Sequence, residues 1–191
     1  ALLHDIVEDT EVKLSDIEEE FGSDVALLVD GVTKVENIAF RSKKHKQAEN
    51  FTKLFLSLAR DLRVIIIKFA DRLNNMETIQ YLSSKKRKEI ALETKEIFVP
   101  LAHRLGMAQL KWKLEDLSLK CLDLRAFNGI KKKIETSSRL NEDILSNAIK
   151  PIKSELNTYK IKSNIFGRYK SISSIHRKIE KSGKKFEEIY D

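Results

Sequence analysis

The chain has 191 residues and a formal net charge of +7; 41% of its residues are hydrophobic and 34% are charged. This length suits one domain, or one domain with part of a second, with a substantial core beneath a heavily charged surface. No apolar run is as long as a membrane span and no signal-peptide pattern is present, so we expect no membrane partner. The single cysteine, Cys121, excludes an internal disulfide, fits a cytoplasmic protein, and is expected to be a small buried side chain on a helix.

The stretch LHDIVEDT at residues 3–10 places a His-Asp pair and a Glu-Asp pair close together. In a helix, His4 and Glu8 share one face, as do Asp5 and Asp9, because residues four apart lie on the same side. An imidazole with carboxylates suits a divalent ion such as zinc, iron or manganese. The same residues are also typical of an acidic, solvated helix end, so a metal site requires further ligands from elsewhere in the chain.

Short helices are predicted to follow. The first covers residues 14–21, with a capping box from Ser15 to Glu18 and a stop at Gly22. The second begins at the capping residue Ser23 and carries a run of valines and leucines.

The sequence GVTK at residues 31–34 is expected to break this second helix, and residues 35–43 are expected to form a loop. Helical periodicity returns over residues 51–59. His45 lies in a basic run between them, and we expect it on the surface rather than at a metal.

Residues 62–82 are apolar over most of a helix circumference, which predicts a central, buried helix. Asp71 lies within it, and a buried charge is costly unless it is paired or bound to a metal. Asp71, Asn75 and Thr78 fall on one face of this helix. Asp71 either pairs with an arginine such as Arg72 or is a distant ligand beside the His-Asp pair, and the presence of that pair favours the ligand.

A long helix is predicted over residues 85–105, capped by serines, kinked or restarted at Pro100 and stopped by Gly106. His103, near its end, has no carboxylate neighbour in the sequence and is expected to be a core or supporting residue. An amphipathic helix should follow over residues 110–124.

Residues 127–159 are charged and only modestly apolar, and we expect two helices there, with Pro151 at a first turn or a kink. From residue 159 the pattern changes: residues 159–166 alternate polar and apolar side chains and predict a strand. A turn and a helix over residues 171–181 should follow, so a new α/β domain is expected to begin near residue 160.

Charge is unevenly distributed along the chain. Residues 1–31 carry a net charge of −9 and the remainder carries +16. Arg168, Lys170, Arg177 and Lys178 cluster around the start of the last predicted helix, a place where phosphate groups bind readily. An acidic end that gathers metal and a basic remainder suit a phosphorylated substrate, although lysine-rich helices are often simply a soluble surface.

Five motifs, taken in order, resemble the Rel/SpoT family, the bacterial enzymes that make and destroy the alarmone (p)ppGpp. The motifs are LHDIVEDT at 3–10, DGVTK at 30–34, KFADRLNNM at 68–76, PLAHRLG at 100–106 and GRYK at 167–170. The resemblance covers essentially the whole chain. The sequence differs from the family at Asn74, where a histidine is usual. Because this position is not itself a ligand, we expect at most a small effect on the site.

The resemblance implies an HD-type hydrolase domain that removes the 3′-pyrophosphate of (p)ppGpp with Mn²⁺, giving GDP or GTP and pyrophosphate. His4, Asp5 and Asp71 match metal ligands of the family. A fourth ligand, a histidine upstream of Ala1, is implied as well, so the chain is interpreted as a fragment that hydrolyses little by itself. Further matches are the pair that handles the attacking water and proton transfer, Glu8 and Asp9, and the nucleotide contacts Asn75 and Thr78.

The resemblance also implies that the last segment opens a synthetase domain, which transfers pyrophosphate from ATP to GDP or GTP. Its early nucleotide-binding residues match Arg168, Lys170, Ser174 and Lys178. The acidic catalytic residues of that domain are expected beyond Asp191, so the fragment should not synthesise. No motif indicates whether the ribosome or another regulator is a partner of the parent protein.

The predicted architecture is therefore an all-α HD-domain helical bundle, followed by the truncated start of an α/β nucleotidyltransferase-like synthetase domain. We expect the hydrolase domain over residues 1–125, connecting helices over 126–158 and the synthetase start over 159–191. Two alternatives remain. The first alternative to the (p)ppGpp hydrolase is another HD phosphohydrolase, acting on a dNTP, a cyclic nucleotide or a monophosphate. The second is a non-catalytic regulatory module.

Overall fold

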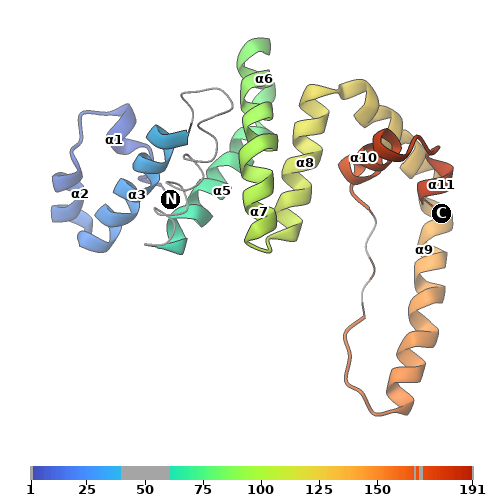
Figure 1. Cartoon of the computed structure of the whole chain (residues 1–191). Helices are drawn as coiled ribbons and strands as arrows, with labels where there is room; N and C mark the ends of the chain where they lie inside the picture. Colours follow the sequence, from blue (N-terminus) through green and yellow to red (C-terminus); the bar gives the residue numbers. More distant parts are fainter. Residues whose placement is uncertain (1, 40–60, 166, 168–169, 191) are drawn as a thin grey trace. The chain divides into compact units, whose positions relative to one another are not determined.

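The computed structural model is built from helices (Figure 1) and describes residues 2–39, 61–165, 167 and 170–190. Side chains within helices are described except at 34–39, 137–146 and 190. Over the described ranges there is no β-strand, which confirms the helical character of the predicted bundle. The chain separates into two compact units, Ala1–Asn75 and Met76–Asp191.

The first unit contains four helices within its described part. They are α1 (Ile6–Asp9), α2 (Leu14–Phe21), α3 (Ser23–Ala39) and α5 (Leu62–Glu77), whose last two residues belong to the second unit. A core of Ile17, Ala26 and Val29 joins α2 to α3, and apolar side chains of the opening stretch pack against it, namely Leu3, Ile6 and Val7. This packing anchors the chain on both sides of the His-Asp pair.

Helix α2 has the predicted bounds and ends at Gly22, whose φ of 85° is a conformation that favours glycine. The predicted capping box from Ser15 to Glu18 is wrong. The helix begins earlier than that box requires, and Lys13 is its N-cap residue. The backbone N–H of Lys13 donates to Asp16 Oδ2 at 3.0 Å. Asp16 therefore accepts the N-cap backbone N–H, the role that the sequence pattern assigned to Glu18.

Helix α3 continues through Gly31, so the predicted break at residues 31–34 and the predicted loop over 35–39 are wrong. The glycine allows a close approach between helices rather than a turn. A Cβ atom at Gly31 would lie 2.8 Å from Cγ2 of Val64 in α5, closer than real Cβ contacts. The predictions for residues 40–43, His45 and 51–59 fall outside the described residues.

Helix α5 confirms the predicted central helix, but it is not buried all round. Val64, Ile65 and Phe69 lie in the core, whereas Ile66 on the opposite face is 56% exposed. The apolar pattern therefore overstated the burial of α5, because folded proteins also leave some hydrophobic side chains exposed at the surface.

The second unit begins with the end of α5 and a short 3₁₀ turn, η1 (Ile79–Tyr81), followed by α6 (Ser84–Glu93). Ser83 caps α6 by accepting the Lys86 N–H. The predicted long helix is interrupted by a π-helical segment, η2 (Thr94–Phe98), before α7 (Val99–Arg104). Pro100 occupies the first turn of α7, directly after the π-helical segment, so the regular helix restarts at the proline as predicted.

Helix α7 ends before Gly106, which has a φ of 71° and confirms the predicted stop. His103 is exposed, so the prediction that it is a core residue is wrong, whereas a supporting role stays a prediction. Helix α8 (Ala108–Leu122) is close to the predicted 110–124 and packs against both α6 and α7. Its central residue Leu114 is completely buried.

The two helices predicted over residues 127–159 are instead one helix, α9 (Leu124–Thr158), which is 35 residues long. Asp123 caps it by accepting the Ala126 N–H at 2.8 Å, and Pro151 lies inside it. Pro151 is exposed, and a long helix can lose the one backbone hydrogen bond that proline removes. Among the described residues, no helix is long and apolar enough to cross a bilayer.

The chain ends with α10 (Ile172–Ser182), as predicted, and α11 (Glu187–Tyr190). Helix α10 packs on α8 and α9: its Ser173 N–H donates to Asp116 Oδ1 at 2.8 Å, and Ile175 is buried. The predicted strand over 159–166 is wrong for its described part, 159–165, which is a turn and irregular chain. Lys160 has a φ of 56°, which no strand allows, and within this part no neighbouring strand offers hydrogen bonds.

Candidate metal centre

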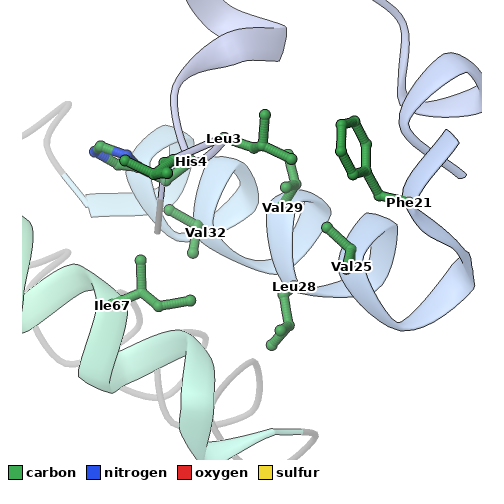
Figure 2. A pocket seen from close by; sticks show the side chains of 9 residues that line it. Leu3, His4, Phe21, Val25, Leu28, Val29, Val32 and Ile67 are labelled. Carbon is green, nitrogen blue, oxygen red and sulfur yellow. The ribbon is translucent and has the colours of Figure 1, made fainter.

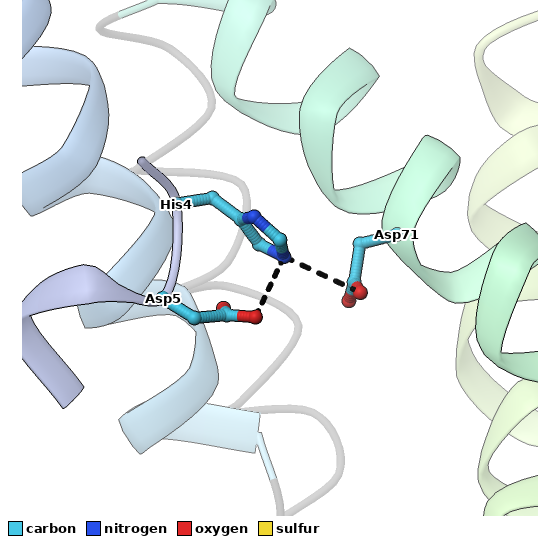
Figure 3. A group of neighbouring side chains, drawn as sticks. All are labelled: His4, Asp5 and Asp71. Atoms are coloured by element: carbon cyan, nitrogen blue, oxygen red, sulfur yellow. Dashed lines mark ion pairs between the residues drawn. The ribbon is translucent and has the colours of Figure 1, made fainter. Parts of the chain in front are cut away.

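Three side chains from two distant parts of the sequence, the adjacent His4 and Asp5 and the distant Asp71, meet in the first unit (Figure 3). His4 lies in the turn before α1, Asp5 is the residue that caps α1, and Asp71 comes from the middle of α5. The core contacts of Leu3 and Ile6 fix the turn, and the burial of Val64 and Phe69 fixes the facing side of α5. Two elements with their own packing thus hold the three side chains together.

Both carboxylates approach the same ring nitrogen. Nε2 of His4 is 2.8 Å from Oδ2 of Asp5 and 3.4 Å from Oδ1 of Asp71. One potential ligand atom from each residue lies within 4.8 Å of the others. The His4 and Asp71 side chains are mostly buried, at 23% and 17% exposed, whereas Asp5 is 43% exposed.

These distances suit a shared metal ion. Two ligand atoms that are each about 2.1 Å from one ion, at an angle between about 90° and 110°, lie about 3.0–3.5 Å apart. A His-Asp hydrogen bond alone would explain the contact with Asp5, but one ring nitrogen has a single hydrogen to donate. A second carboxylate directed at the same atom from another helix is compatible with a shared divalent cation. One nitrogen and two carboxylate oxygens form an ordinary ligand set for zinc, iron or manganese.

Asp71 has further partners on its own helix. The amide Nδ2 of Asn75 donates to Asp71 Oδ1 at 3.0 Å, so these two predicted site residues do share one face of α5. The other carboxylate oxygen, Oδ2, lies 3.9 Å from Nζ of Lys68. Hydrogen bonds and charges around a ligand carboxylate fix its orientation.

The opening stretch is only partly helical. Residues 2–5 form a turn and α1 covers Ile6–Asp9, so the prediction of one helix carrying all four polar residues is wrong at its start. The first helical turn still brings Glu8 and Asp9 back over Asp5, because both of their N–H groups donate to the Asp5 carbonyl, at 3.0 and 2.9 Å. Their side chains are exposed and lie outside the three-residue ligand group.

An apolar pocket of about 500 Å³ opens beside His4 (Figure 2). Its walls come from the opening turn, α2, α3 and α5, and His4 is the one polar side chain among those that line it. The imidazole therefore has an apolar surface on one side and the two carboxylates on the other, which restricts the positions that the ring can adopt.

The other predicted site residues belong to the second unit. Thr78 is exposed and caps η1. Arg168 lies outside the described residues. On the last segment, Lys170 Nζ donates to the carbonyl of Ile189 at 2.7 Å, and Ser174 accepts a hydrogen bond from the Ser171 hydroxyl at 2.7 Å. Lys178 is exposed on α10. The binding role of these residues stays a prediction.

Cys121 lies on α8, as predicted, and is half-buried. Burial raises the pKa of its thiol, and the nearby cations Arg87 and Lys88 offset only part of this effect. The thiolate that nucleophilic chemistry needs is therefore disfavoured. This agrees with the prediction that Cys121 is a packing residue.

Comparison with known proteins gives consistent matches. The family model described as HD domain matches residues 1–108. The chain is 42% identical over 191 residues to guanosine-3′,5′-bis(diphosphate) 3′-pyrophosphohydrolase of Spiroplasma citri, and 40% identical over 191 residues to the bifunctional (p)ppGpp synthase/hydrolase SpoT of Escherichia coli. It is 42% identical over 190 residues to GTP pyrophosphokinase of Streptomyces coelicolor.

Each of these alignments covers the whole chain but only part of the relative: 26% of the Spiroplasma protein, 27% of SpoT and 22% of the Streptomyces protein. The chain thus spans about a quarter of the length of the proteins it matches. Because the similarity runs through both units, it includes the candidate metal centre and the last helices alike.

Proposed function

The chain belongs to the HD-domain family and to the Rel/SpoT proteins within it, and from this premise we propose that its parent protein hydrolyses (p)ppGpp. In this reaction water breaks the bond between the 3′ oxygen and its pyrophosphate, and GDP or GTP and free pyrophosphate result. The convergence of His4, Asp5 and Asp71 carries this proposal, because it provides the ligand set that a metal-dependent phosphohydrolase needs.

We propose that His4 Nε2 and the carboxylates of Asp5 and Asp71 hold Mn²⁺. When bound, such an ion lowers the pKa of its water and offsets negative charge on the phosphate. The chain positions the ligands without it: Asn75 and Lys68 orient Asp71, and the hydrophobic contacts of Leu3 and Ile6 hold the His-Asp turn.

Glu8 and Asp9 are proposed to orient the attacking water and to accept its proton. Their position supports this role, since α1 folds them back within one turn of Asp5 and leaves their side chains open to solvent. A carboxylate near a cationic centre is a suitable proton acceptor. Asn75 and Thr78 are proposed to contact the nucleotide, both being exposed.

The whole protein is further proposed to be bifunctional and cytoplasmic, making (p)ppGpp from ATP and GDP or GTP. The similarity to a GTP pyrophosphokinase and to a synthase/hydrolase supports this, as does the basic character of the last segment. Arg168, Lys170, Ser174 and Lys178 would bind nucleotide phosphates in this reaction.

The test uses the full parent protein, stripped of metal with EDTA. It is supplied in turn with Mn²⁺, Mg²⁺ or Zn²⁺ and with ppGpp, a dNTP, a cyclic nucleotide or a nucleoside monophosphate. We expect pyrophosphate release from ppGpp with Mn²⁺ and loss of that activity after EDTA treatment. Preferred turnover of another substrate would identify a different HD phosphohydrolase, and no turnover with any substrate would identify a regulatory module; either result contradicts the proposal.

A further inference from the structure

Lys68 is the most deeply buried charged residue in the described part of the first unit. Only 2% of the residue is exposed, and its Nζ lies 3.9 Å from Oδ2 of Asp71, one helical turn further along α5. This oxygen is the one that does not face His4, since the contact with His4 is made by Oδ1. The lysine therefore contacts the back of the candidate ligand carboxylate.

Packing does not explain this residue. The neighbouring core positions of α5 are Val64, Ile65 and Phe69, and a methionine or leucine would fill the same space without a charge. Removing an ammonium group from water is costly, and a buried ion pair often stabilises a fold no more than apolar residues of the same volume. The ammonium at this position is better explained by an effect on the centre that it touches.

We propose that Lys68 sets the net charge of the candidate metal centre and thereby its preference for a polyanionic substrate. This inference rests on the proposed function. A neutral His4 with ionised Asp5 and Asp71 has a charge of about −2, which Lys68 changes to about −1. With a divalent cation the four groups sum to about +1, whereas without the lysine they would sum to zero.

The charge of Lys68 has opposite effects on the binding of the metal ion and on the binding of the substrate. It repels a metal cation and so weakens metal binding, and it attracts the phosphate groups of a substrate and so strengthens substrate binding. A protein that binds a tetraphosphate or pentaphosphate nucleotide gains from the second effect. The first effect is tolerable as long as three ligand side chains hold the ion.

The experiment replaces Lys68 in the full protein by methionine, which keeps the length of the side chain and removes its charge. Calorimetric titration of the metal-free protein with Mn²⁺ should show binding about tenfold tighter for Lys68→Met. The KM for ppGpp at saturating Mn²⁺ should rise about tenfold, with a smaller change in kcat. Lys68→Arg, which keeps the charge, should retain the original values for both ligands.

If Lys68 had only a structural role, Lys68→Met would damage the site and weaken the binding of both Mn²⁺ and ppGpp. Weaker or unchanged Mn²⁺ binding by Lys68→Met would overturn the inference; if that variant does not fold, Lys68→Gln provides the same comparison. Lys111→Met is the matched control, since it removes a mostly buried ammonium that pairs with Glu115 at 3.3 Å in the second unit, and it should leave Mn²⁺ affinity unchanged. Absence of Mn²⁺ binding by the unsubstituted protein would contradict the metal centre itself.

Discussion

Replacing Asp71 with asparagine in the full protein is expected to lower the rate of ppGpp hydrolysis by about a thousandfold or more. The substitution keeps the size of the side chain but removes the charge that faces His4 Nε2 at 3.4 Å, and the amide cannot replace a carboxylate in a two-carboxylate ligand set. Mn²⁺ binding should weaken in parallel. Pyrophosphate release and calorimetric titration measure the two effects independently.

The control for this variant is Asp61→Asn, which removes a carboxylate immediately before the same helix. Arg63 pairs with Asp61 at 2.7 Å, and its hydrogen bonds lower the pKa of that carboxyl group, so Asp61 has a different role at the start of α5. We expect its loss to leave hydrolysis within about twofold of the original rate, as for a surface ion pair. An Asp71→Asn protein that cleaves ppGpp at the normal rate would refute the metal centre.

Replacing Gly31 with alanine is expected to destabilise the protein by about 1–3 kcal/mol. The new methyl group would meet Val64 Cγ2 at 2.8 Å, and a valine in a helix has essentially one rotamer and cannot turn away. Helices α3 and α5 must then separate, and α5 carries Asp71. Urea denaturation should show the loss of stability, and Mn²⁺ binding should weaken with it.

The double variant Gly31→Ala with Val64→Ala separates this steric effect from others. Val64→Ala alone leaves a cavity, and the alanine at position 31 should partly fill it, so the double variant should be more stable than the sum of the two single changes predicts. Gly129→Ala in α9 is the control: among the described residues no atom lies within 4 Å of the place its methyl group would take, and the change should stabilise the helix by about 0.5–1 kcal/mol. A fully additive double variant would contradict the close approach of α3 and α5.

The sequence was sufficient to predict the parts of the site that depend on local pattern. Asp71 and Asn75 share a face because they are four apart on a helix, and their contact at 3.0 Å confirms it. The proximity of Asp71 to His4, 67 positions away, could be inferred from the cost of a buried charge near a His-Asp pair, and the structure brings the two together. Their roles as ligands stay a prediction.

The errors came from features that local pattern does not contain. Gly31 normally signals a break, but its purpose here is set by Val64 on another helix. The alternation over residues 159–165 resembles a strand, yet a strand needs a neighbour, and the described chain offers none. Pro151 suggested a boundary that the surrounding helix overrides.

Lys68 was missed for a related reason. Within an apolar helical run, a lysine three positions before an aspartate is usually a solvated charge, and its burial follows only from the packing of α5. The available signal was the position of Lys68 on the buried side, one turn from Asp71, at a place where methionine or leucine would be expected.

The most direct test of the central claim is the location of Mn²⁺ by anomalous diffraction from crystals of the full protein grown with the ion. We predict an anomalous peak in contact with Nε2 of His4 and with carboxylate oxygens of Asp5 and Asp71. A protein that hydrolyses ppGpp with Mn²⁺ but shows no peak at these three side chains would contradict the proposed centre.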